Sequence, residues 1–300
     1  MRPYRVEPID YTTGVDELRH VRETVFVHEQ QVPVEEEWDA LDPLCHHVIA
    51  RDAQGRPIGT GRLTPERKIG RMAVLGDWRG HGVGDALLQA LLTQARRQQW
   101  PEVSLHAQVS AETFYARHGF LPEGERFSEA GIEHQKMRRR LGGAAAVERP
   151  SAAIAAVIGL VAQARRSLMI YSRELDPGLL DAPPVLETLR RYATRRGPTT
   201  VQILLQDAAA PQHNLSPLLA LAQRLPSVFA FRAVTDPVDK AYPSAFVVND
   251  DGGYYFRPLG HRSDGETDLD GPGRARQLRE EFARIWERAR PVGEYRALGI

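Results

Sequence analysis

Residues 77–92 read DWRGHGVGDALLQALL and hold the feature that most constrains the fold, a glycine-rich turn between a predicted strand and a predicted helix. The strand covers residues 69–75, and residues 85–98 place four leucines and an alanine on one face of the helix. Glycine at a helix entrance costs backbone entropy, so we expect the bare backbone to be needed there. Successive N–H groups and the helix N-terminus would together form a site for an anion such as phosphate.

Two common phosphate-binding loops do not fit this stretch. A Walker loop requires Lys and then Ser or Thr after its last glycine, whereas Asp85 and Ala86 follow Gly84. A dinucleotide fingerprint requires G-x-G-x-x-G, whereas the spacing here is G-x-G-x-G. A glycine-rich helix entrance that binds nothing therefore stays open as an alternative.

Length and composition exclude several classes of protein. The chain of 300 residues predicts two domains, and 42% hydrophobic with 26% charged residues is typical of a globular protein. The formal net charge of zero shows none of the basic bias of a dedicated nucleic-acid binder. One cysteine, Cys45, excludes an intramolecular disulfide and is compatible with a cytoplasmic location. No signal-peptide pattern begins the chain, and the longest apolar run, residues 152–164, is too short to span a membrane.

The pattern of strands and helices divides the chain into two α/β halves. We predict a first domain over 1–143, a linker over 144–153 (rich in small residues) and a second domain over 154–300. In the first half we expect strands over 5–9, 46–51, 57–64, 69–75, 103–108 and 136–141, and helices over 15–29, 85–98 and 111–118. In the second half we expect strands over 167–173, 200–206, 228–234, 245–249 and 253–257, and helices over 154–165, 185–196, 215–224 and 274–290.

Several motifs in the first half resemble one family. Residues 79–84, RGHGVG, match the R/Q-x-x-G-x-G/A loop of the GNAT N-acetyltransferase superfamily. VFVHEQQVPVEEEWDALDPLCHHVIA at 25–50 is similar to the signature of its ElaA-like branch, and LHAQVSAETFYARHGFLPEG and FSEAGIEHQKMRR continue the likeness. The resemblance covers about residues 4–141. It implies a mixed, mostly antiparallel sheet with helices on both faces, and transfer of an acetyl group from acetyl-coenzyme A (acetyl-CoA) directly to an amine.

The resemblance also implies how the co-substrate is held. The glycine-rich loop would cradle the pyrophosphate, and the backbone of the preceding strand would bind the pantetheine arm in a slot where that strand splays from residues 103–108. The implied contacts are Met72, Ala73, Val74, Arg79, Gly80, His81, Gly82, Val83 and Gly84.

The resemblance and the acidic run at 35–42 suggest the catalytic groups. In many family members a tyrosine at the place of Tyr115, in FYARHGF, protonates the departing thiolate; a core aromatic is the alternative. We take Glu37 as the general base, directly or through water, against the alternative that the acidic run is a solvated face. Glu29 and Gln30 would shape the acceptor pocket, and His134 could titrate there or be structural.

The sequence leaves the acceptor open among a polyamine, an aminoglycoside, an amino acid and a protein amine, and it leaves a homodimer open. We predict no metal site at Cys45-His46-His47, because neighbouring strand residues point to opposite faces of a sheet. A coenzyme A-binding sensor without turnover, whose second domain binds a partner, is the main alternative function.

The second half faintly resembles one half of a phospholipase D-like domain, through SLMIYSREL, TVQILLQD and SAFVVNDDGGYYFRP. Active members carry H-x-K-x-x-x-x-D, whereas Tyr242-Pro243-Ser244 and Asn249 stand at the matching places. Since histidine supplies the covalent phosphoryl chemistry, a phosphodiesterase or nuclease is disfavoured. We expect this half to be non-catalytic and to act as a scaffold, a dimerisation surface or a recognition domain.

Overall fold

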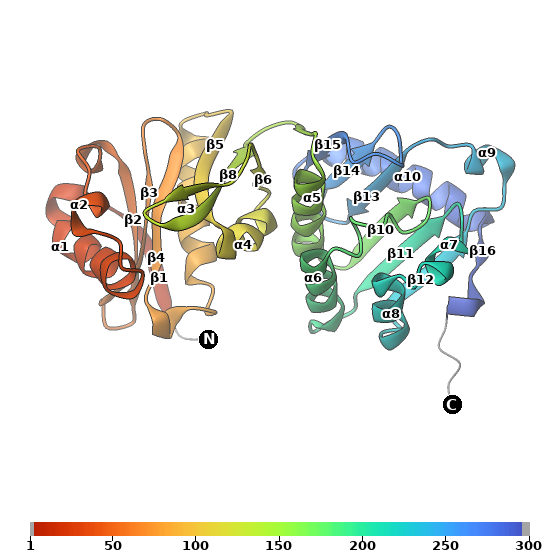
Figure 1. Cartoon of the computed structure of the whole chain (residues 1–300), viewed down its shortest axis with the longest axis horizontal. Helices are drawn as coiled ribbons and strands as arrows, with labels where there is room; N and C mark the ends of the chain where they lie inside the picture. The colour runs from red at the N-terminus through yellow and green to blue at the C-terminus, as the bar shows by residue number, and fades with distance from the viewer. Residues whose placement is uncertain (1–2, 296–300) are drawn as a thin grey trace. The chain divides into compact units, whose positions relative to one another are not determined.

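The computed structural model describes residues 3–295 and divides the chain into two compact units (Figure 1). The first unit contains the residues up to Val109 together with Gly124–Leu141. The second contains Ser110–Glu123 together with the residues from Gly142 onward. Each unit is built on its own sheet and is described by itself below.

The sheet of the first unit is antiparallel except at one junction. Its strands lie in the order β1-β2-β3-β4-β5-β8, with β7 pairing β8, and only β4 and β5 are parallel. The strands are β1 (Tyr4–Ile9), β2 (His46–Asp52), β3 (Pro57–Leu63), β4 (Lys68–Val74), β5 (Glu102–Gln108), β7 (Phe127–Glu129) and β8 (Ile132–Arg140). The helical segments are α1 (Tyr11–Arg22), the π-helix η1 (Glu23–Glu29), α2 (Val34–Glu37), η2 (Asp42–Leu44), η3 (Gly76–Trp78) and α3 (Val83–Arg97).

Helices α1 and α3 cover opposite faces of this sheet. A Cβ built on Gly59 of β3 would meet Leu87 and Val83 of α3, so this face of β3 lies against α3. Ala73, whose ladder partner is the next residue along β3, packs instead in the cluster that contains Val21 of α1. Successive strand residues point to opposite faces, which places the two helices on the two sides.

The second unit has a mixed sheet in the order β16-β12-β11-β10-β13-β14-β15-β9, in which β10, β11 and β12 are parallel. The strands of this sheet are β9 (Ala145–Val147), β10 (Ser167–Ser172), β11 (Thr200–Leu205), β12 (Phe229–Ala233), β13 (Ala245–Asn249), β14 (Tyr254–Arg257), β15 (Gly265–Asp268) and β16 (Arg290–Pro291). The short strand β6 (Leu121–Pro122) is not part of it. Its helices are α4 (Glu112–Arg117), α5 (Pro150–Gln163), α6 (Pro183–Thr194), α7 (Ala210–His213), α8 (Pro217–Arg224), α9 (Pro237–Lys240) and α10 (Pro272–Arg288). The 3-10 turns η4 (Val109–Ala111) and η5 (Gly293–Tyr295) precede α4 and follow β16.

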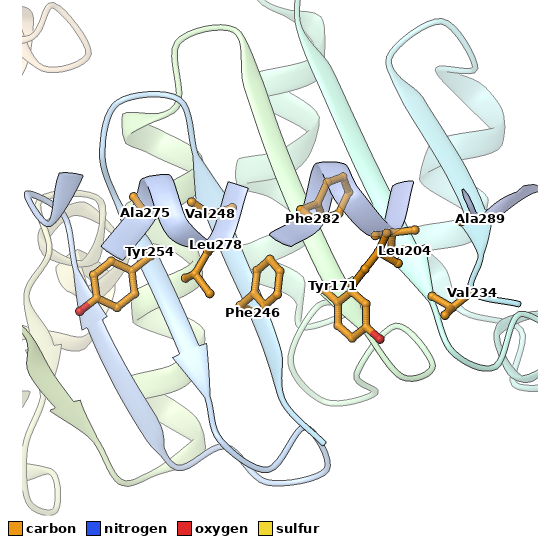
Figure 2. Packing of buried hydrophobic residues seen from close by; sticks show 11 residues of the cluster. Tyr171, Leu204, Val234, Phe246, Val248, Tyr254, Ala275, Leu278, Phe282 and Ala289 are labelled. Atoms are coloured by element: carbon orange, nitrogen blue, oxygen red, sulfur yellow. The ribbon is translucent and has the colours of Figure 1, made fainter. Parts of the chain in front are cut away.

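Helix α10 packs a hydrophobic core against one face of this sheet. Leu278 and Phe282 of α10 pack with Phe246 and Val248 of β13 and with Tyr171 of β10 (Figure 2). Asn249, the next residue of β13, points to the opposite face, where its side-chain amide donates to the Leu160 carbonyl of α5 at 3.0 Å. The sheet is therefore covered on both faces.

The structure confirms the mixed α/β class of both halves and revises several elements. The single helix expected over 15–29 is the α-helix α1 followed by the π-helix η1. The segment predicted as a linker contains the strand β9, paired with β15, and the first turn of α5. The expected helices over 85–98 and 274–290 form with shifts of about two residues, at α3 and α10.

Candidate active site

The glycine-rich turn adopts the backbone that its sequence suggested. Gly80 and Gly82 have φ of 74° and 82°, in the left-handed region that favours glycine, and Gly82 is the N-cap of α3. A Cβ built on Gly80 would meet nothing within 4 Å, whereas one on Gly82 would lie 3.3 Å from the Tyr4 hydroxyl. The first N–H groups of a helix have no partner within the helix, so the turn offers donors to an anion.

Strands β4 and β5 separate soon after they begin. They form only two ladder pairs, the second of them between Ile69 and Leu105. Beyond this pair β4 continues to Val74 alongside β3, and β5 continues to Gln108 alongside β8. The separation confirms the predicted splay, and it leaves the edge of Met72–Val74 that faces β5 outside any ladder with that strand.

A β-bulge lies in β4 beside this separation. Arg71 has φ of 51°, unusual for a residue other than glycine, and the register of β3 against β4 shifts between Thr60 and Arg62. The Arg71 side chain donates to the backbone carbonyls of Glu36 at 3.1 Å and Glu37 at 3.2 Å. The bulge thus directs the Arg71 guanidinium toward residues 36 and 37.

Arg22, at the end of α1, holds the same segment from inside the unit. It is fully buried, and its Nε donates to Glu37 Oε1 at 2.5 Å while Nη2 donates to the Glu37 carbonyl oxygen at 2.6 Å. Its Nη1 contacts both carboxylate oxygens of Asp42 at 3.1 Å. The ring of Trp38 covers the guanidinium, with its centroid 4.4 Å from the central carbon.

A third arginine completes this network. Arg62 of β3 donates from Nη1 to Asp42 Oδ1 at 2.6 Å and to Asp39 Oδ2 at 2.8 Å. Burial by itself would raise the pKa of Asp42, but the charge of Arg22 and the hydrogen bonds from both arginines lower it below its ordinary value. Together the three arginines fix the acidic segment Glu35–Asp42 to the sheet.

Glu37 therefore lies inside the network. The residue is 1% exposed, and burial raises its pKa against the lowering effect of Arg22 and Arg71. Service as a general base would require the pair with Arg22 to open, and the base role of Glu37 stays a prediction.

Glu29 ends the π-helix and contacts the glycine-rich loop. Its carboxylate pairs with Nη2 of Arg79, whose Nε donates to the Val74 carbonyl at 3.0 Å. Arg79 thus bridges the last residue of β4 and the segment expected to contact the acceptor. Both side chains are partly exposed, so the guanidinium can be reached by a soluble anion.

Gln30, the next residue, contacts the other separated strand. Its Oε1 accepts from Nε2 of Gln108, the last residue of β5, at 2.9 Å. His134 is the ladder partner of Gln108 on β8; its Nδ1 lies 2.8 Å from the Ile132 carbonyl, and its ring stacks on Phe127. The structure therefore brings Glu29, Gln30 and His134 to the two strands that separate.

Tyr115 lies on α4, in the unit that does not contain the glycine-rich loop. Its ring packs edge-on against Phe114 and Phe120, as the alternative of a core aromatic also predicts. Burial raises the pKa of its hydroxyl to about 12, so the phenol is protonated at neutral pH. The acid role of Tyr115 stays a prediction.

Cys45 and His47 lie beside the buried network of arginines and carboxylates. His47 is buried with Nε2 2.8 Å from the Asp42 carbonyl, and burial raises the pKa of the Cys45 thiol to about 11. Over residues 3–295, no group of three or more histidine, cysteine, aspartate or glutamate side chains is placed to hold a metal ion. No helix in that same range combines the length and the apolar composition of a membrane span.

Sequence reasoning missed the arginines of the buried network. Arg22, Arg62 and Arg71 come from three elements, and nothing in the local pattern marks them as buried. The one available signal was the acidic run itself, since carboxylates at buried positions require cations nearby.

Comparison with known proteins gives a separate family match for each half. Residues 16–141 match the family described as acetyltransferase (GNAT) domain. Residues 149–298 match a family described as a domain of unknown function (DUF7931). The phospholipase D-like resemblance of the second half gains no support from these matches.

Individual relatives match the first half over nearly their whole length. The uncharacterized N-acetyltransferase YjcF of Bacillus subtilis is 38% identical over 124 residues, which are 40% of this chain and 88% of that protein. Among solved structures, Escherichia coli ElaA is 26% identical and covers 46% of this chain and 99% of its own, with a TM-score of 0.41. An acyl-CoA N-acyltransferase from Pseudomonas aeruginosa is 29% identical with the same coverage and a TM-score of 0.42.

The structure has a left-handed glycine turn at a helix N-terminus and a parallel strand pair that separates. Together with the family match of residues 16–141, these features define an acyltransferase with a GNAT-like sheet. The chain belongs to the GNAT acetyltransferase family. This membership implies a coenzyme A thioester as co-substrate and an amine as acceptor.

Proposed function

We propose that the first unit transfers an acetyl group from acetyl-CoA to the nitrogen of an amine. The observation that carries this proposal is the separation of β4 from β5 directly before a glycine turn that caps α3. A thioester supplies an acyl group that an uncharged amine can attack. Direct transfer then requires orientation and removal of a proton.

The residues present fit such a co-substrate. The N–H groups at Gly82–Gly84 would donate hydrogen bonds to the oxygens of a pyrophosphate, and left-handed Gly80 presents open space where a side chain would stand. Arg79 adds a positive charge that the solvent reaches. The backbone of Met72, Ala73 and Val74 would hold the arm, and His81 and Val83 complete the loop.

We propose Tyr115 as the acid that protonates the departing sulfur. Its pKa of about 12 keeps the phenol protonated, which an acid requires. Glu29, Gln30 and His134 are our proposed acceptor contacts, because they contact or adjoin the two strands that separate. Glu37, paired with two arginines, fits better as the group that holds the acceptor segment in place.

The test is acetylation of an amine panel with detection of both products. Spermidine, kanamycin, amino acids and a lysine-containing peptide would be incubated with acetyl-CoA, and free thiol and acetylated amine would be measured by absorbance and mass spectrometry. We expect equal amounts of the two products with at least one amine class. Binding of acetyl-CoA without any acetylated product would instead favour the sensor, and absence of binding would refute the proposal.

A further inference from the structure

A cluster of titratable side chains lies on the first unit's sheet next to the separated strands. His106 of β5 has Nδ1 2.9 Å from Glu129 Oε2 on β7 and 3.1 Å from Nζ of Lys68 on β4. The Phe127 ring meets the imidazole edge-on, with centroids 4.7 Å apart. The sequence patterns did not single out any of these residues.

Two contacts at Nδ1 make opposite demands on the tautomer of this histidine. The Lys68 ammonium, 3.1 Å away, can only donate and would need a bare Nδ1, whereas the shorter contact with the Glu129 carboxylate needs a protonated one, and we take the shorter contact to set the tautomer. A carboxylate oxygen 2.9 Å from Nδ1 requires a hydrogen between the two atoms, so Nδ1 donates to Glu129. Burial would raise the pKa of Glu129, but the hydrogen bond from His106 and the charges of His106 and Lys68 lower it. The carboxylate is therefore ionised at neutral pH, and the neutral imidazole carries its lone pair on Nε2.

His106 lies at the closed end of the separation between β4 and β5. Ile69 and Leu105 form the last ladder pair, and His106 is the next residue of β5. It shares a face of that strand with Gln108, two residues on, which bonds Gln30. The side chain is 31% exposed, so an incoming molecule can reach it.

The reactive end of the co-substrate would come to the same place. This step rests on the proposed function. The pyrophosphate would be held by the loop after Val74, at the open end of the separation, and an arm extending along β4 leads toward the closed end. A thioester carried on that arm would therefore end near His106.

We propose that His106 is the general base of the acetyl transfer and that Glu129 positions it. The protonated acceptor gives one proton to Nε2 of His106, and its nitrogen lone pair forms the new bond to the acetyl carbonyl carbon. The carbon–sulfur bond then breaks, the nitrogen loses its second proton, and the thiolate sulfur is protonated. One proton in total leaves to solvent through the imidazole, which balances an ammonium and a thioester against an amide and a thiol.

His106 meets the requirements of a base more directly than Glu37 does. Glu37 is 1% exposed and occupied by Arg22, whereas His106 keeps one ring nitrogen aimed away from its carboxylate partner. A histidine oriented by a carboxylate is a frequent arrangement for proton transfer near neutral pH.

Several charged groups face this imidazole. Glu129 and Lys68 contact it directly, and Lys136 is its ladder partner on β8. His134 stacks on the far side of Phe127.

The first test measures the tautomer of His106 and does not require the protein to catalyse a reaction. Nitrogen-15 NMR of the histidine side chains should show neutral His106 with Nδ1 protonated and Nε2 bare, and Glu129→Gln should disturb that preference. A neutral His106 protonated on Nε2 in the wild type would overturn the proposal.

The second test compares two probe acceptors at high concentration. Methylamine is protonated at pH 7 and needs a base, whereas hydroxylamine is mostly uncharged. We expect His106→Gln to lower kcat/KM for methylamine by about 10²- to 10⁴-fold, with a much smaller loss for hydroxylamine. His20→Gln, on the exposed surface of α1, is the control and should change neither rate.

Equal losses with both amines, or no loss with methylamine, would overturn the base role. Acetyl-CoA titrated into His106→Gln should bind as it does to the wild type, and weakened binding would also count against the proposal. Failure of the wild type to bind acetyl-CoA is a different result, because it would refute the proposed function itself.

Discussion

Removing Arg22 is expected to destabilise the first unit strongly. The change Arg22→Met deletes the contacts to Glu37 and Asp42, whose residues are 1% and 0% exposed, and keeps a side chain of similar length. Breaking a buried ion pair from one side costs about 3–5 kcal/mol, because a charge is left without its partner. Arg71 at 3.4 Å from Glu37 and Arg62 at 2.6 Å from Asp42 offset part of this loss. We therefore expect the lower end, about 3 kcal/mol.

The assay is amide hydrogen exchange read by mass spectrometry on peptides from β2 and β3. These strands belong to the core of the first unit, so their slowest amides report the free energy of unfolding of that unit separately from the other. The matched control is Arg56→Met. Arg56 pairs with Asp52, but its side chain is 73% exposed, and such surface pairs contribute about 0–1 kcal/mol.

The reasoning would be refuted if Arg22→Met cost no more than Arg56→Met. That result would mean that Glu37 and Asp42 reach water or other partners easily when the arginine is removed. A loss near 3 kcal/mol together with faster exchange in residues 34–44 would support the network as the anchor of the acceptor segment.

Three further predictions concern other groups. The first unit should keep its stability above about pH 4 and lose it as pH falls further, because the lowered pKa of Asp42 keeps the folded carboxylate charged where the unfolded one is protonated. A free energy of unfolding, obtained from amide exchange, that stays constant from pH 7 to 3 would contradict this. Tyr115→Phe should lower kcat by roughly 10²- to 10⁴-fold without weakening acetyl-CoA binding, and an unchanged kcat would remove Tyr115 from the reaction. Asn249→Ala should destabilise the second unit by about 1–3 kcal/mol in urea unfolding, since its side chain bonds Leu160 and Gly253; no loss would argue against this structural role.

The sequence predicts best the elements whose signal is local. The leucines of α3 repeat at helical spacing, and Leu87, Leu88, Leu91 and Leu92 are all fully buried. The glycine turn was also predictable, because left-handed backbone is encoded in the glycines themselves. Both features lie between Gly80 and Arg97 and do not depend on distant contacts.

Elements that depend on distant partners could not be predicted. Apolar spacing over residues 15–29 fits an α-helix and a π-helix almost equally, so η1 was not separated from α1. Ala145–Val147 becomes a strand only through pairing with β15, more than a hundred residues later. The contact of His106 with Glu129 likewise arises when β7 folds back on β8, whose own neighbour is β5.

The central claim is that the glycine turn receives the pyrophosphate of a coenzyme A thioester. Calorimetric titration of acetyl-CoA into the wild type, Gly82→Trp and Gly55→Trp tests it most directly. Gly55 is a matched control because it has the same φ of 82° and lies in the turn between β2 and β3, so both variants carry the same backbone strain.

We expect the wild type and Gly55→Trp to bind with a Kd on the order of micromolar, and Gly82→Trp to show no measurable heat. Binding by Gly82→Trp equal to that of the control, or no binding by the wild type, would contradict the account.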